Sequence, residues 1–293
     1  GSGHGVGNTA QAKGRASDIG TSSRDAGAQM NTPRPILQFS HANGFPAPCY
    51  RQLFACLEAR FDLRWVDRFG HEPTYPVTDG WPKLTDQLIH AIESHRHPVI
   101  AVGHSLGGYL SLRAAVRRPD LIRGVILLDA AILSRVKGGA LAFTKKVGIA
   151  EKLGPAPGTL FRRREWDDHD AAVAYFQTKT VFRRFDPRCL DDYVRFGTEP
   201  AGERIRLRFE PEIEHRIYQT LPHDLVQECA RLAVPGGLIY GEQSDLTRRV
   251  GLSASERWLK VAPAKGGHLF PFQFPEAAAQ AIARMIGDLG LGV

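Results

Sequence analysis

Residues 103–107 read Gly-His-Ser-Leu-Gly and place Ser105 between two glycines. The apolar run 98–102 before them predicts a strand, and residues 106–117 after them predict a helix. A serine at the tip of a tight strand-to-helix turn exposes its hydroxyl, and the glycines leave room for the bend. The helix that follows directs its free N–H groups and the positive end of its dipole at the same spot. Ser105 is therefore the predicted nucleophile of an acyl-transfer reaction.

A serine hydroxyl needs a neighbouring base to become nucleophilic at neutral pH. The chain has 11 histidines, and only His268 lies beyond residue 223. It follows two glycines and the apolar run 258–261, which predicts a strand. A loop at that point can bring an imidazole to the carboxyl edge of a sheet, so His268 is the predicted general base.

Two aspartates could orient the histidine. Asp129 ends the apolar run 124–128, and Asp245 follows the apolar run 236–240. Either carboxylate could accept the imidazole N–H, hold its tautomer and stabilise the imidazolium. Asp129 has an alternative role as a helix N-cap or in hydrogen bonding at a strand end.

Acyl transfer also requires N–H donors for the negative oxygen that develops on the carbonyl. The backbone N–H of Leu106, directly after the nucleophile, is one expected donor. The other is expected from the loop 41–46, His-Ala-Asn-Gly-Phe-Pro, which follows the first predicted strand. We prefer the backbone N–H of Asn43, with Phe45 as the alternative if the loop is aligned on its Asn-Gly-Phe-Pro part.

The elements that must position these residues alternate along the chain. Strands are expected at 36–40, 63–66, 98–102 and 124–128, then at 236–240 and 258–261, and helices at 48–60, 80–95, 106–117 and 275–289. Unbroken apolar strands separated by helices are typical of a parallel sheet covered on both faces. The predicted fold class is therefore α/β.

The alternation stops between residues 130 and 224, a charged stretch rich in arginine and aromatic residues that shows helical tendency and no clear strand. We predict a helical cap at 130–224, inserted into a core formed by 31–129 and 225–293. The cap's aromatic side chains could line an apolar pocket or form the cap's own core. They are Trp166, Phe176, Phe182, Phe185 and Tyr193. Residues 1–30 have no apolar run, and we interpret them as a disordered leader, or a segment added for expression, that ends at Met30.

Composition excludes several other classes of protein. The formal charge of +7 is spread along the chain, which argues against nucleic-acid binding. The four cysteines form no C-x-x-C pair, so a zinc site is not expected, and their scatter fits a reducing, cytoplasmic compartment. No window is apolar enough for a transmembrane helix, so we predict no membrane partner.

These residues together resemble the α/β-hydrolase superfamily, and within it the serine-dependent members that carry a cap. The resemblance covers residue 33 to the C-terminus. Its anchors are the elbow at 103–108, the loop at 41–46, Asp245 and His268. Asp245 has the chain position that most members use for the acid, so the resemblance favours it over Asp129. Family sheets usually open with two strands before the oxyanion-loop strand, and here we expect those strands to be missing.

The resemblance implies a hydrolase that cleaves a small-molecule carboxylic ester through an acyl-enzyme and needs no metal ion or organic cofactor. Members with aspartate at the elbow include dehalogenases and epoxide hydrolases, and Ser105 argues against both. Two alternatives stay open. One is a C–C bond hydrolase or aminopeptidase on the same triad, and the other is a non-catalytic protein that binds a small molecule. The sequence leaves the oligomeric state undetermined.

Overall fold

The computed structural model describes residues 34–146 and 156–292. The proposed leader at 1–30 lies outside the described residues. The expectation that two opening strands are missing concerns the same residues and stays a prediction. From Arg34 onward the chain clusters as one compact unit, so the division into core and cap stays a prediction. No helix in the described ranges combines the length and the apolarity needed to cross a bilayer.

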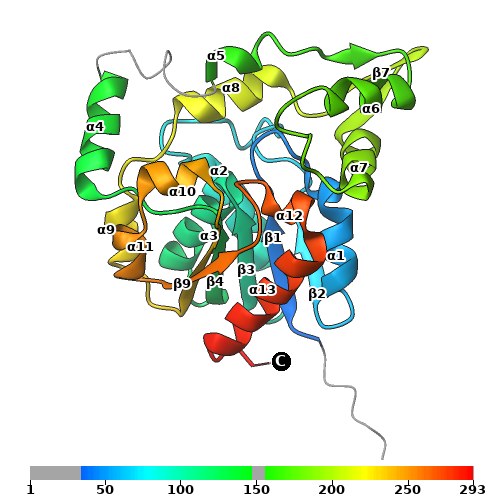
Figure 1. Cartoon of the computed structure of the whole chain (residues 1–293). Coiled ribbons are helices and arrows are strands. Elements are labelled where there is room, and N and C mark those ends of the chain that lie inside the picture. Colours follow the sequence, from blue (N-terminus) through cyan, green and yellow to red (C-terminus); the bar gives the residue numbers. More distant parts are fainter. Residues whose placement is uncertain (1–33, 147–155, 293) are drawn as a thin grey trace, which may run out of the picture. The chain divides into compact units, whose positions relative to one another are not determined.

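A parallel sheet of six strands forms the centre of the described chain (Figure 1). Its order is β2-β1-β3-β4-β8-β9, and every pairing within it is parallel. The strands are β1 (Ile36–Ser40), β2 (Asp62–Trp65), β3 (Val99–His104), β4 (Ile122–Leu128), β8 (Gly236–Gly241) and β9 (Lys260–Ala264). The predicted α/β fold class is confirmed. Strand β9 begins two residues later than expected and leaves Trp258 outside it, 37% exposed.

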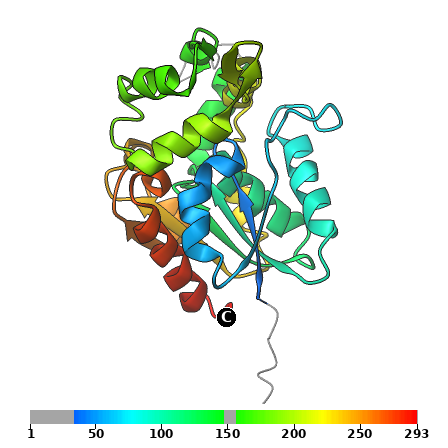
Figure 2. The same ribbon diagram turned by 90° about the vertical axis from the view of Figure 1, so that its right-hand side faces the viewer.

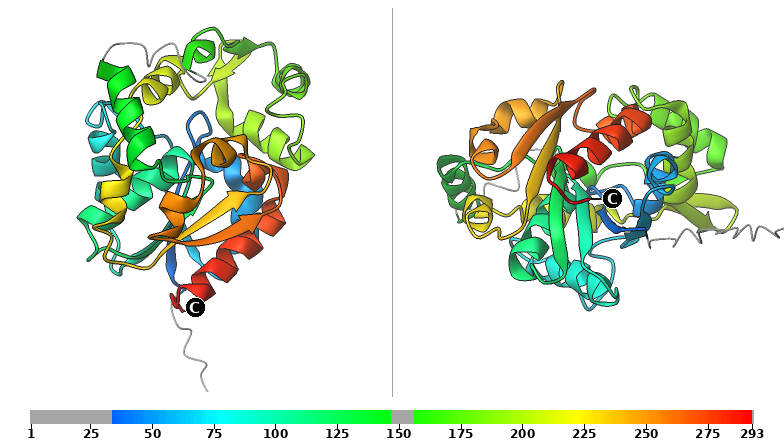
Figure 3. Two further views of the ribbon diagram at one scale, coloured as in Figure 1. Left: turned by 60° about the vertical axis from the view of Figure 1, so that its left-hand side comes forward. Right: turned by 90° about the horizontal axis from the view of Figure 1, so that it is seen from below.

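Helices cover both faces of this sheet, because alternate residues of each buried strand point to opposite sides. Ile100 and Val102 of β3 belong to one apolar cluster, while Val99 and Ala101 belong to another. The first cluster packs under α1 (Arg51–Leu57), α12 (Phe270–Gln273) and α13 (Pro275–Asp288). The second packs under α2 (Pro82–Glu93), α3 (Leu106–Arg117) and α9 (Leu225–Cys229). Figures 2 and 3 show the two helical layers with the strands between them.

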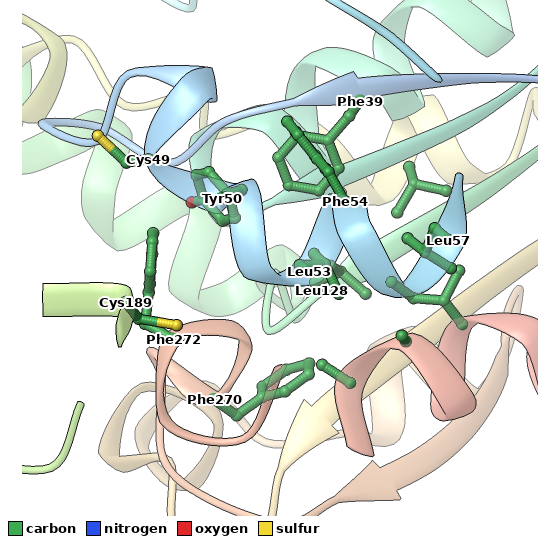
Figure 4. Packing of buried hydrophobic residues seen from close by; sticks show 14 of the residues in the cluster. Phe39, Cys49, Tyr50, Leu53, Phe54, Leu57, Leu128, Cys189, Phe270 and Phe272 are labelled. Atoms are coloured by element: carbon green, nitrogen blue, oxygen red, sulfur yellow. The ribbon is translucent and has the colours of Figure 1, made fainter. Parts of the chain in front are cut away.

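Aromatic side chains dominate the first layer. Figure 4 shows Phe39 of β1 facing Phe54 of α1, and Phe272 of α12 beside Cys189. The rings of Phe39 and Phe54 meet edge-on, with their centroids 5.1 Å apart. Phe272 of α12 packs on Tyr50 with ring centroids 4.3 Å apart, which holds α12 and the neighbouring loop of His268 in this layer.

The order in which the chain adds strands to the sheet reverses between β1 and β3. From β1 the chain continues outward to β2, and from β3 it continues in the opposite direction to β4. Strand β1 lies between β2 and β3, and the helices that follow β1 and β3 cover opposite faces. The loops after these two strands therefore diverge at the carboxyl edge of the sheet, which is where open α/β sheets bind ligands. These loops contain residues 41–46 and Ser105.

The insertion between β4 and β8 contains more than helices. Besides α9, the helices described in it are α4 (Arg135–Lys146), α5 (Ala156–Thr159), α6 (His169–Gln177), α7 (Pro187–Gly197) and α8 (Pro211–Gln219). The expectation that this stretch has no strand is wrong, because β5 (Glu165–Trp166), β6 (Thr198–Ala201) and β7 (Arg204–Leu207) form an antiparallel sheet. Their exposed faces carry cross-strand ion pairs such as Arg206 with Glu199, so strands this short and charged show no apolar pattern.

Two short helices, α10 (Asp245–Val250) and α11 (Ser253–Glu256), follow β8, and the 3-10 helix η1 (Ala47–Tyr50) precedes α1. Helix α7 of the insertion packs against η1 and α1. The insertion is thereby joined to the loop that follows β1.

Candidate active site

Ser105 occupies the strained turn that the sequence predicts. Its backbone has φ 52° and ψ −112°, a conformation that few non-glycine residues adopt. The bend brings backbones so close that a Cβ at Gly103 would lie 2.0 Å from the Gly107 carbonyl oxygen. A Cβ at Gly107 would lie 2.0 Å from the Ser40 carbonyl oxygen. Both glycines are therefore required by the geometry, and strain held in this way is typical of functional sites.

Asp129 is the carboxylate that meets His268. The Nδ1–H of His268 donates to Asp129 Oδ2 over 2.7 Å, since a carboxylate can only accept. Asp129 is wholly buried, and it too has a positive φ, 45°. Its other donors are the Gly241 backbone N–H at 2.7 Å and the hydroxyls of Ser244 and Thr247 at 2.5 and 3.2 Å.

These donors determine the charge of Asp129. Burial by itself would raise the pKa of this carboxyl, but the hydrogen bonds from His268, Ser244 and Gly241 together hold the pKa below its usual value. Asp129 is thus an anion at neutral pH. It is oriented as an acceptor and is placed to stabilise a positive charge on the imidazole.

Among the described residues, Asp245 makes no hydrogen bond or ion pair with His268, so we propose the alternative, Asp129, as the acid. The carboxylate of Asp245 pairs with Arg248, and its side chain is 72% exposed. The physical reason is the cap of α10. The Ser244 hydroxyl accepts the Thr247 N–H at 3.2 Å, which starts the helix and turns Asp245 outward. The segment after β8 therefore supplies Ser244 and Thr247 to Asp129, a role that sequence reasoning missed.

The loop after β1 brings Asn43 to the same pockets as Ser105. The Phe45 N–H donates to the Ala42 carbonyl at 3.1 Å, which removes Phe45 as a donor for a ligand. Among the described residues, the backbone N–H of Asn43 has no hydrogen-bond partner, and Asn43 shares two pockets with Ser105. The Asn43 side chain donates to the Glu214 carbonyl of α8 at 3.0 Å, which holds the loop. The N–H of Leu106 lies in the first turn of α3 and has no intrahelical acceptor.

A directional hydrogen-bond chain links the three loops of the site. His104 Nε2 lies 2.8 Å from the His268 carbonyl oxygen, which can only accept, so this nitrogen carries the proton. His104 Nδ1 then accepts the Tyr50 hydroxyl at 2.7 Å. The same Tyr50 oxygen accepts the Ala42 N–H at 3.1 Å. The chain runs from the loop after β1, through η1 and the elbow, to the loop of His268.

Two buried histidines make stability depend on pH. Burial lowers the pKa of His104 to about 3 and that of His41 to about 4. Their unfolded pKa is near 6.5, so below that value the unfolded chain takes up protons that the folded chain refuses. We expect the free energy of unfolding to fall by about 1 to 2 kcal/mol per pH unit between pH 6 and 5. Urea unfolding at pH 7, 6 and 5 measures this, and a flat profile would contradict it.

Two hollows meet at Ser105 and His268. The first, which we call the apolar cavity, has a volume of about 510 Å³ and extends between α3, α4, α8 and α10. Its walls include Trp81, Leu133, Leu141, Ile217, Leu221 and Val250. The second, which we call the polar groove, has a volume of about 340 Å³ and follows the loop of His268. Its walls include Arg184, Gln243, Asp245, Gly267 and Gln273.

The five aromatic residues expected to line a pocket or to form the core of the cap are all buried in one apolar cluster, together with residues of β1, α1 and α12. Phe176, Phe182 and Tyr193 pack on one another with ring centroids 4.8 to 5.1 Å apart. Trp166 is fully buried in the same cluster. These three packed rings border a separate pocket of about 350 Å³ that does not include Ser105 or His268. The apolar cavity is made by other residues, which sequence reasoning did not identify.

Comparisons with known proteins agree with this architecture. The chain is 25% identical over 267 residues to the 2-(acetamidomethylene)succinate hydrolase of Mesorhizobium japonicum, covering 86% of this chain and 88% of that protein. It is 33% identical over 96 residues to the pimeloyl-[acyl-carrier protein] methyl ester esterase of Xylella fastidiosa, covering 33% of this chain and 36% of that one.

Solved structures show the same fold. The crystal structure of E-2-(acetamidomethylene)succinate hydrolase matches with a TM-score of 0.68 at 22% identity, over 86% of this chain and 91% of that chain. An esterase of M. tuberculosis matches with a TM-score of 0.65 at 20% identity, over 87% and 86%. The model of the alpha/beta hydrolase family matches residues 39–281. The chain therefore belongs to the alpha/beta hydrolase family.

Proposed function

We propose that this protein is a serine hydrolase that cleaves a carboxylic ester or related acyl bond, with Ser105, His268 and Asp129 as its triad. The observation that carries the proposal is the 2.7 Å hydrogen bond from His268 to the buried Asp129, beside a serine held at φ 52°. A histidine fixed by a buried carboxylate next to a strained serine is the arrangement that activates a hydroxyl nucleophile.

The reaction follows from the direction of these hydrogen bonds. Ser105 Oγ attacks the carbonyl carbon while His268 Nε2 takes its proton, and Asp129 stabilises the imidazolium. The backbone N–H groups of Leu106 and Asn43 bind the oxyanion. The bond to the leaving group then breaks, and the leaving oxygen takes the proton from His268. A water activated by His268 releases the acid from Ser105.

The two hollows suggest how a substrate lies. The leaving group must receive its proton from His268, which favours the polar groove beside the loop of that residue. The acyl group then occupies the apolar cavity. Among the residues that the structure describes, no aspartate or glutamate lines this cavity, so those residues offer no carboxylate to the free amine of an aminopeptidase substrate. We therefore favour an ester or thioester of an apolar acid over the peptidase alternative.

Covalent labelling and turnover together test the function. The protein is expected to hydrolyse p-nitrophenyl esters within the series C2 to C12 and to react with a fluorophosphonate probe. Mass spectrometry of the labelled protein should locate the phosphonyl group on Ser105. Labelling of Ser105 without ester turnover would move the C–C hydrolase alternative ahead, and absence of both would move the binding-protein alternative ahead.

Filling the apolar cavity should shorten the acyl chain that the protein accepts. Leu141 lines the cavity from α4, so Leu141→Trp removes space that longer chains need. At about 0.8 kcal/mol per buried methylene, kcat/KM for the C8 ester is expected to fall about 10- to 100-fold, with the C2 ester changed less than threefold. Val136→Trp is the matched control, because Val136 lies on the same helix and is 83% exposed. An equal loss on both esters would mean that the acyl group lies elsewhere.

A further inference from the structure

An arginine of the cap lies at the polar groove, next to the loop that carries His268. Arg184 lines the groove together with Ser105 and His268. Its guanidinium donates to the side-chain oxygen of Gln243, and its Nη1 lies 3.8 Å from the position that a Cβ on Gly267 would occupy. The charge is thus held beside the path of any leaving group that His268 can protonate.

This positive charge has no carboxylate partner in the described part of the chain. The hydrogen-bond acceptor of Arg184 is a neutral amide. Asp245 also lines the groove, but it pairs with Arg248. The cation that reaches the apolar cavity, Lys137, donates to the Arg249 and Val250 carbonyls at the end of α10. The polar groove therefore has a guanidinium that an anion can approach, whereas the ammonium of Lys137 already donates to two backbone carbonyls.

The neighbouring arginine provides an internal comparison. Arg183 is exposed, donates to the Thr178 carbonyl at 3.4 Å and does not line the groove. Two adjacent arginines thus differ in position while sharing charge and exposure.

We propose that Arg184 recognises an anionic group on the leaving side of the substrate, so that the preferred substrates are esters or thioesters of an apolar acid with a negatively charged alcohol or thiol. The inference rests on the proposed function, because it assigns the leaving group to the polar groove. In the reaction the C–O or C–S bond breaks, and the leaving atom takes its proton from His268. Arg184 exchanges no proton and keeps its charge throughout.

A matched pair of esters tests the inference. We would measure kcat/KM for 4-(hexanoyloxy)benzoate, which has an anionic leaving group, and for its neutral methyl ester. In Arg184→Gln the ratio of anionic to neutral kcat/KM is expected to fall about tenfold, the effect of losing one charge-assisted contact. Arg183→Gln should leave the ratio within twofold of the wild type. The wild-type ratio should also fall as NaCl rises, because salt screens an exposed charge.

A second pair identifies the kind of anion. Hexanoyl-coenzyme A and S-hexanoyl-N-acetylcysteamine share the thioester but differ in their phosphates. A larger effect of Arg184→Gln on this pair would support a phosphate-bearing thiol, and a larger effect on the benzoate pair would support a carboxylate. If the wild type cleaves all four compounds and Arg184→Gln changes neither ratio, the inference is overturned while the proposed function stands. If no compound is cleaved and Ser105 is not labelled, both are overturned.

The chain of hydrogen bonds through Tyr50 and His104 carries a second, independent inference. Each hydrogen bond in this chain can have only one donor. Both side chains are buried, with exposed fractions of 1% for Tyr50 and 0% for His104. A buried chain with every donor and acceptor matched resists rearrangement, because breaking one bond leaves a polar group unpaired.

We infer that Tyr50 and His104 are positioning residues. Their hydrogen bonds hold the loop of His268 in place relative to Ser105 and connect it to the loop that carries Asn43. Without the Tyr50 hydroxyl, His104 Nδ1 loses its donor, and the ring can adopt the tautomer that presents a lone pair to the His268 carbonyl. That carbonyl would be repelled, and the imidazole of His268 would be displaced from the serine. This inference also rests on the proposed function.

Kinetics of conservative variants separate positioning from simple stability. Tyr50→Phe keeps the ring and is expected to lower kcat about tenfold with KM within twofold of the wild type. His104→Gln keeps a donor for the His268 carbonyl and should retain at least tenfold more kcat than His104→Leu. Ser111→Ala is the control for a lost buried hydrogen bond, since its hydroxyl bonds Ser40 at 3.4 Å. Wild-type kcat in folded Tyr50→Phe, or equal kcat in the two His104 variants, would overturn the inference.

Discussion

Asp129→Asn is expected to lower kcat by about 10⁴ while leaving KM within a fewfold of the wild type. An asparagine can still accept the Gly241 N–H through its oxygen, so the fold around it should hold. It no longer offers a carboxylate to His268 Nδ1, which loses both its fixed tautomer and the charge that stabilises the imidazolium. A loss of this size accompanies the same change in other serine triads.

Asp245→Asn is the matched control for that substitution. Its side chain is 72% exposed and pairs with Arg248, so the triad should be unaffected. We would measure kcat and KM for p-nitrophenyl hexanoate in both variants, together with their melting temperatures. Full activity in Asp129→Asn and loss in Asp245→Asn would reverse the assignment of the acid.

Ser105→Ala has the largest expected effect, a fall in kcat of about 10⁵ to 10⁶, because it removes the atom that forms the acyl-enzyme. Fluorophosphonate labelling should disappear with it. The triad acts as a unit, so adding Asp129→Asn to Ser105→Ala should cost almost nothing further. The measurement is a comparison of the two single variants with the double variant on one ester. Multiplicative losses in the double variant would show that the two residues do not share a mechanism.

The site depends on strain that the surrounding structure maintains. Ser105 and Asp129 both have positive φ angles and both follow buried strands of the sheet. Their neighbours hold them there: Ser105 N–H donates to the Leu128 carbonyl at 2.9 Å, and Asp129 N–H to that of Ile239 at 2.7 Å. The backbone of the sheet thus fixes the proposed nucleophile and the proposed acid relative to each other, which would lower the cost of reaching the reactive geometry.

The sequence by itself was sufficient for the parallel α/β sheet, the elbow around Ser105 and the family. These features depend on local signals: apolar strands alternating with helices, and glycines at the positions where any Cβ would collide with backbone. The turn at Gly103 and Gly107 could be predicted because its requirement is steric and lies within five residues.

Which aspartate contacts His268, the two hollows and the strands of the insertion were decided only by the tertiary structure. Asp129 and Asp245 each follow an apolar strand, and nothing local distinguishes them. The difference arises because the Ser244 hydroxyl both caps α10 and donates to Asp129 across 115 positions of sequence. Arg183 and Arg184 are likewise equivalent in sequence, and the fold places one of them at the groove. Such choices depend on which distant groups meet when the core packs, and a one-dimensional pattern does not contain that information.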